Sequence, residues 1–114
     1  MDLVNDIQKL MDELTGSIKV LRKHGNDLAV AEKEYKIKLR QEALKLRSEK
    51  NMPVTLINQI IFGIDEVAEL RLKRDIAQTM YDCNLEHINI TKLKLRLLEA
   101  QLNREYGSSG KGNL

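Results

Sequence analysis

The chain has 114 residues, 42% hydrophobic and 32% charged, and its 19 basic and 17 acidic side chains give a net charge of +2. One proline and six glycines are too few for a low-complexity disordered chain, and a single cysteine excludes a disulfide scaffold. No apolar run reaches 18 residues, so no membrane span is predicted, and no basic segment of a secretory signal opens the chain. We expect an intracellular protein with a single helical domain over residues 1–106.

A seven-residue apolar repeat predicts a first long helix over about residues 2–50. Its spacing is that of a left-handed coiled-coil seam. A helix break at Gly25 is the alternative, because glycine is favoured just after a helix end. Leu21 and Leu28 keep the same phase across that point, so we expect one helix, at most kinked near Gly25. The residues at intervals of seven are Ile7, Leu14, Leu21, Leu28 and Tyr35.

A short connector follows the first helix. Asn51 tolerates the left-handed conformation at a helix end, and Met52 is biased away from helix because it precedes Pro53. The next residues are very apolar and end at Gly63. Their β-branched content would suit a strand, but an opening proline and a closing glycine favour a short helix over about residues 54–62.

A second long helix is predicted over about residues 65–106, with Asp65 as its N-cap and Gly107 at its end. Residues 107–114 are rich in glycine and serine, and we expect a flexible tail there. The helix carries two apolar stripes. The first stripe is Val67, Leu70, Arg74, Ala77, Tyr81, Asn84, Ile88, Thr91, Leu95, Leu98 and Leu102. The second stripe is Leu72, Ile76, Met80, Cys83, His87, Ile90 and Leu97.

Two stripes on one helix require two packing partners. One partner is the first long helix, and the other is either the N-terminal segment folded back or a second subunit. A lone pair of long helices also has a thin core. We therefore expect an all-α, coiled-coil-like antiparallel helical hairpin with a short connecting helix, assembled as a homo-oligomer, a dimer or higher.

The sequence contains no catalytic motif. Phosphate-binding, dinucleotide-binding and nucleophile-elbow patterns are all missing. Cys83 and His87 stand four residues apart, but a zinc site needs three or four ligands, so we interpret both as core residues of the second stripe. We expect no enzymatic activity, no metal and no cofactor.

Polar residues interrupt the first stripe, and such residues usually set the register of a helical seam. An alternative is a pocket between helices that sequesters a small ligand such as a nucleotide signal. Its polar groups would be Arg74, Tyr81, Asn84 and His87, with the Arg74 guanidinium suited to a carboxylate or phosphate.

Basic residues cluster between Lys36 and Lys50 and again between Lys92 and Arg96. A solvated helix face explains this pattern most simply. A nucleic-acid-binding accessory protein is the alternative, although no aromatic residues interleave with the bases to stack single strands.

The stretch from Tyr35 to Tyr106 resembles small helical-hairpin proteins encoded by temperate phages of Gram-positive bacteria. Its landmarks include Met52-Pro53-Val54-Thr55, the run from Glu66 to Asp75, and Arg104-Glu105-Tyr106. The resemblance implies a phage early or accessory gene acting in a bacterial cytoplasm. Proteins in that setting often bind and inhibit a host or defence enzyme, or assist phage DNA metabolism. We expect the first role, with a host protein of a defence or nuclease complex as the partner. The expected contact residues are Lys36, Arg40 and Arg47 on the first helix and Ile57, Ile60, Ile61 and Phe62 in the connector.

Overall fold

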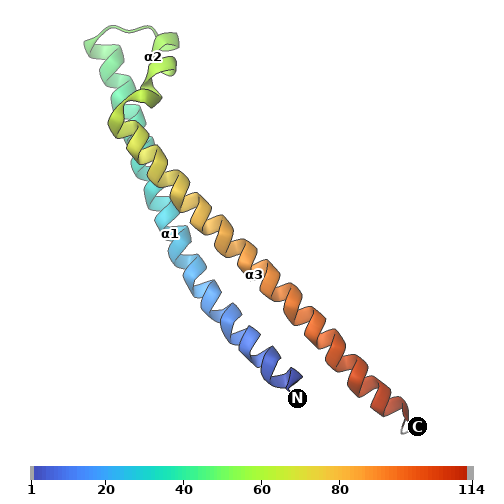
Figure 1. Ribbon diagram of the computed structural model, residues 1–114. Coiled ribbons are helices and arrows are strands. Elements are labelled where there is room, and N and C mark those ends of the chain that lie inside the picture. Colours follow the sequence, from blue (N-terminus) through green and yellow to red (C-terminus); the bar gives the residue numbers. More distant parts are fainter. Residues whose placement is uncertain (1, 113–114) are drawn as a thin grey trace. The chain divides into compact units, whose positions relative to one another are not determined.

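The fold is all-α. A computed structural model describes residues 2–112, with side chains described for residues 2–107. Along the chain lie α1 (Leu3–Glu49), α2 (Val54–Ile60), the 3₁₀ turn η1 (Ile61–Gly63) and α3 (Asp65–Gly112) (Figure 1). The predicted order of a long, a short and a second long helix is confirmed.

The chain comprises two compact units. The terminal unit contains residues 2–22 and 82–112, and the connector unit is Lys23–Tyr81. Both long helices contribute a segment to each unit. In the connector unit Glu34 contacts Lys73, and Lys38, one turn later on α1, contacts Glu66 on α3. Rising numbers on α1 thus meet falling numbers on α3, so the two helices are antiparallel.

The same antiparallel arrangement holds within the terminal unit. Ser17 of α1 lies beside Asn84 of α3, and Glu13 lies beside His87. The predicted antiparallel pairing of the long helices is therefore confirmed in each unit.

α1 is a single helix, and the alternative of a break at Gly25 is wrong. Gly25 lies inside this helix, where its backbone is close to the ring of Tyr81. A Cβ built on Gly25 would lie 3.6 Å from Cε2 of Tyr81. Buried and half-buried residues recur along α1 at alternating steps of four and three, which is the coiled-coil spacing. They include Leu3, Ile7, Leu10, Leu14, Ser17, Leu21, His24, Leu28, Ala31 and Tyr35.

The predicted end of α1 is confirmed in its details. Asn51 adopts the left-handed conformation with φ of 49°. The Met52 N–H donates to the Leu46 carbonyl at 3.3 Å. The Pro53 carbonyl then accepts the first backbone hydrogen bonds of α2, from the N–H groups of Leu56 and Ile57.

The connector packs back onto the end of α1. Ile57 and Ile61 are buried with Leu46 in one apolar cluster. Half-buried Leu39, Ala43, Met52 and Ile64 surround this cluster. The last turn of the predicted 54–62 helix tightens into the 3₁₀ turn η1, which is a common way for a short helix to end.

α3 begins at Asp65 itself, so its N-cap lies one residue earlier than predicted. Ile64 occupies the N-cap position, and its carbonyl accepts the Ala68 N–H at 2.9 Å. Asp65 and Glu66 therefore lie in the first turn, where acidic side chains interact favourably with the helix dipole.

α3 also extends beyond its predicted end. The helix was expected to stop at Gly107 but runs to Gly112, because no proline interrupts it and glycine only weakens a helix, by about 1 kcal/mol per residue. The start of the expected flexible tail at residue 107 is corrected accordingly. Its last two residues, 113 and 114, lie outside the described part of the chain.

Candidate interaction surfaces

The two apolar stripes of α3 have different environments. Every residue of the first stripe, from Val67 to Leu102, is buried or half-buried. Every residue of the second stripe, from Leu72 to Leu97, is exposed. α1 can cover only one side of α3, and the N-terminal segment belongs to α1 and does not fold back. The second stripe therefore has no covering element within either unit.

Cys83 and His87 are consequently surface residues. Their interpretation as core residues is wrong, because they lie on the stripe that α1 does not cover. The His87 side chain is 49% exposed, and its Nε2 lies 3.0 Å from Oε1 of Glu13 on α1. This contact is an exposed pair at the edge of the helix seam.

A second row of exposed apolar residues lies on α1 in the connector unit. Val30, Ile37 and Leu44 recur at intervals of seven and are all exposed. The sequence interpretation missed this row, although its regular spacing is a visible signal. The row lies two positions after half-buried Leu28 and buried Tyr35, which corresponds to about 200° around the helix and places it on the outer side of α1.

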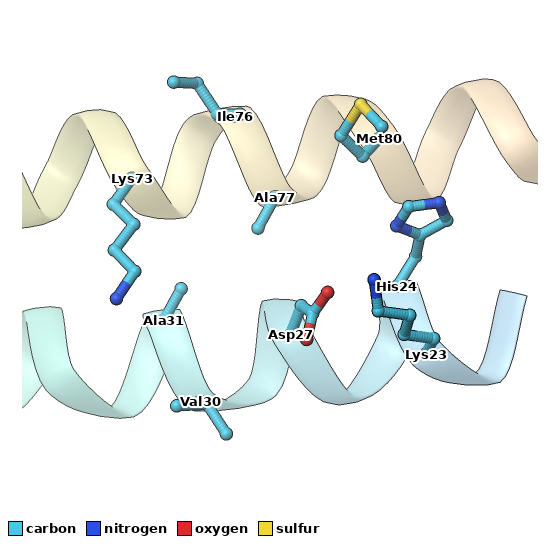
Figure 2. Close-up of a pocket in the computed structure, with 9 residues that line it drawn as sticks. All are labelled: Lys23, His24, Asp27, Val30, Ala31, Lys73, Ile76, Ala77 and Met80. Carbon is cyan, nitrogen blue, oxygen red and sulfur yellow. The ribbon is translucent and has the colours of Figure 1, made fainter. Parts of the chain in front are cut away.

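The exposed rows of α1 and α3 meet at one groove. The groove has a volume of about 470 Å³ and lies between the two helices of the connector unit. Figure 2 shows Lys73 extending from α3 toward α1 beside Ala31 and Ala77. Its lining is Lys23, His24, Asp27, Val30, Ala31, Lys73, Ile76, Ala77 and Met80. We call the exposed apolar residues of these two rows in the connector unit the connector face, of which Val30, Ile76 and Met80 line the groove; its residues are Val30, Ile37, Leu44, Leu72, Ile76 and Met80.

Opposite charges border the connector face on its two helices. On α1, the exposed cations Lys33, Lys36 and Arg40 lie close to the apolar row. On α3, the exposed acids Glu69 and Asp65 lie about one and two turns before Leu72. Lys73, which lines the groove, is paired with Glu34 of α1. Toward the connector, the α1 border is therefore basic and the α3 border acidic.

The basic residues predicted as partner contacts differ in their engagement. Lys36 forms a salt bridge with Glu32 at 3.3 Å. Arg47 donates through Nη1 to the Met52 carbonyl at 3.0 Å, so it helps to secure the end of α1. Arg40 is exposed and forms no salt bridge among the described residues.

Lys38 joins the two helices of the connector unit. Its ammonium group binds Glu66 of α3 and lies 3.2 Å from Oε1 of Glu42. The hydrogen bond to Glu66, followed by that to Glu42, raises the pKa of Lys38 above 10.5. The same hydrogen bond from Lys38 lowers the pKa of Glu66 below 4.5.

The connector residues predicted as contacts fall into two groups. Ile57 and Ile61 are 5% and 3% exposed, so they are core residues and their assignment to a contact surface is corrected. They point toward the end of α1 because a two-turn helix can bury only one side. Ile60 and Phe62 are 39% and 42% exposed on the other side. The guanidinium of Arg71 lies 4.8 Å from the centre of the Phe62 ring.

Two of the four predicted pocket residues belong to the connector unit, and both are engaged within the protein. The Arg74 guanidinium lies 4.7 Å from the centre of the Tyr35 ring. Its Nε donates to Oδ1 of Asp75 at 2.9 Å. Tyr81 is half-buried against Gly25. This stacking explains how a cation is accommodated in the helix seam.

The polar residues of the terminal unit support the register interpretation. Asn84 donates through Nδ2 to the Ser17 carbonyl at 3.1 Å, which links α3 directly to the backbone of α1. Thr91 is buried, and its hydroxyl donates to the His87 carbonyl at 2.9 Å. The side chains of Asn84 and Thr91 thus both have hydrogen-bond partners inside the protein.

Among residues 2–112 no helix is long and apolar enough to cross a membrane. The described residues also contain no group of three or more His, Cys, Asp or Glu that could hold a metal ion. Comparisons with protein-family models, curated proteins and solved structures found no match. The exposed apolar rows indicate oligomerisation or partner binding.

Proposed function

We propose that this chain is a non-enzymatic protein-interaction module whose exposed apolar rows dock onto helices of other polypeptides. The observation that carries the proposal is the second stripe of α3. Its residues are exposed, yet from Leu72 to Ile90 they recur at the three- and four-residue steps that keep them on one side of the helix. Surface residues scattered singly need no explanation, but a regular apolar stripe is suited to burial by another helix.

The proposed partner is a bacterial host protein. This part rests on the resemblance to proteins of temperate phages, and the mode of action would be inhibition of a defence or nuclease complex by occupation of a surface. The chain would need no catalytic group for this role, since binding alone can block an active surface or an assembly contact.

Nucleic-acid binding receives less support from the side chains. Lys36 is paired with Glu32, and Arg47 is hydrogen-bonded to the connector backbone. A phosphate-binding surface would require these cations to exchange their present partners for phosphate groups.

A capture experiment with matched variants tests the proposal. Tagged wild-type chain would be mixed with lysate of a Gram-positive host, with and without nuclease treatment, and bound proteins would be identified by mass spectrometry. Ile90→Asp places a charge in the exposed stripe, whereas Asn89→Asp places the same charge on the neighbouring exposed position of α3. We expect a stoichiometric partner with wild type and Asn89→Asp but not with Ile90→Asp.

Two results would contradict the proposal. Capture that is equal with both variants would mean that the stripe is not the docking surface. Partners that disappear on nuclease treatment would instead support nucleic-acid binding, and the affinity should then fall steeply with salt because phosphate contacts release counterions.

A further inference from the structure

We infer that a second copy of this chain covers the connector face, so that two connector units form a symmetric four-helix bundle. This inference rests on the proposed function, because it names the occupant of one of the proposed docking surfaces. In the bundle, the α1 row of one copy packs on the α3 row of the other, and the reverse contact forms at the same time.

The connector face has the shape that such a bundle requires. α1 and α3 lie side by side at the groove, to which α1 contributes Val30 and α3 contributes Ile76 and Met80 (Figure 2). Ile37 and Ile76 are exposed although they are large and apolar. Two helices with one shared apolar side form half of a four-helix bundle, and a second identical layer completes it.

Charge complementarity selects the second copy as the occupant. The α1 border carries Lys33, Lys36 and Arg40, whereas the α3 border carries Asp65 and Glu69. If α1 of one copy faces α3 of the other, the basic border meets the acidic border. The opposite arrangement, α1 against α1, would place like charges together.

A twofold axis parallel to the helices produces this pairing. It places α1 of one copy over α3 of the other in antiparallel orientation and keeps every residue at its own height. Within one copy Lys38 lies at the height of Glu66. Arg40 of one copy therefore meets the turn that contains Asp65 and Glu69 of the other, within about one helical turn.

The exposed area is also sufficient for such an interface. The chain exposes 8523 Å². A folded monomer of 13.1 kDa is expected to expose roughly 6400 Å². A standard stable interface removes about 800 Å² from each partner. The excess of roughly 2000 Å² is larger than that area, so the chain has enough exposed surface for such an interface, although a dimer would still leave each chain more exposed than an ordinary monomer of its mass.

Sedimentation equilibrium on the full chain tests the inference. We expect wild type to have about twice the 13.1 kDa chain mass at micromolar concentration. Ile37→Asp and Ile76→Asp should each reduce self-association at least tenfold, because a charge would be buried in the interface. Val54→Asp is the matched control, since Val54 is an exposed apolar residue on α2, away from the connector face. It should leave the mass unchanged.

Charge exchange provides a second test that does not depend on any aspartate variant remaining folded. Arg40→Glu and Glu69→Lys should each weaken the homodimer by about four- to twentyfold, because each removes two exposed ion pairs that contribute about two- to fivefold each. A mixture of the two variants should restore wild-type affinity, because both contacts of the mixed dimer then join opposite charges.

A monomeric wild type would overturn the inference, as would a dimer that survives both connector-face variants or a mixture that does not restore affinity. The two proposals fail separately. A monomer that still captures a host protein in an Ile90-dependent manner would overturn self-association and leave the proposed function standing.

Discussion

Gly25→Ala is expected to stabilise the protein. Gly25 lies inside α1, where glycine is about 0.8–1.0 kcal/mol less favourable than alanine. The added Cβ would lie 3.6 Å from Cε2 and 3.9 Å from Cδ2 of Tyr81, which is ordinary van der Waals contact without a clash. Partial burial of a methyl group adds up to about 0.8 kcal/mol. The expected gain in the free energy of unfolding is about 1–1.5 kcal/mol.

Gly16→Ala is the matched control. Gly16 lies in the same helix, but a Cβ there would meet no atom within 4 Å. Its gain should be that of helix propensity alone, about 0.8–1.0 kcal/mol. The difference between the two variants therefore reports the contact with Tyr81.

Urea denaturation followed by circular dichroism measures both gains. Protein concentration must be the same in every sample, because self-association would make the apparent stability depend on it. A gain of 1 kcal/mol should also raise Tm by about 4 °C for a chain of this length.

A loss of stability in Gly25→Ala alone would refute the reasoning. Alanine is disfavoured where glycine has a positive φ. Such a loss would mean that α1 is broken at Gly25, or that the Tyr81 ring leaves no room for a methyl group.

Ile61→Ala should lower the free energy of unfolding by about 2–5 kcal/mol, because it leaves a cavity at a buried site. Ile60→Ala, at an exposed position, should lower it much less. Chemical denaturation measures both losses, and equal losses would contradict the assignment of Ile61 to the core. Glu66→Gln should reduce the loss in the free energy of unfolding that the wild type shows as the pH is lowered into the acid range. The hydrogen bond from Lys38 lowers the pKa of Glu66 below 4.5, so its contribution is present above that pH and is lost as pH falls through the lower folded value. If Glu66→Gln loses stability at acid pH as steeply as the wild type does, this assignment is refuted.

The helices and most of their boundaries were predictable because their signals are local. Asn51 and Pro53 determine where α1 ends and α2 begins through their own backbone preferences. The end of α3 was wrong for a related reason. Glycine raises the energy of a helix without forbidding it, so its presence at residue 107 could not by itself fix a boundary.

The candidate surfaces were only partly predictable. Arg40, Ile60 and Phe62 are exposed as expected, but Ile57 and Ile61 are buried against Leu46, which lies on another helix. Hydrophobicity is the same for all the isoleucines of the connector. Their different exposures depend on which side of α2 and η1 meets α1.

The sequence by itself determined that this protein is helical, that α1 is long and that α3 carries two apolar stripes, because periodicity within one segment encodes these features. Only the tertiary structure decided which stripe faces α1. Both stripes have comparable spacing, and the choice depends on contacts between distant residues, such as Asn84 with the Ser17 carbonyl and Arg74 with the Tyr35 ring. Those contacts bury the polar residues of the first stripe and leave the more apolar second stripe exposed, where another helix can bind.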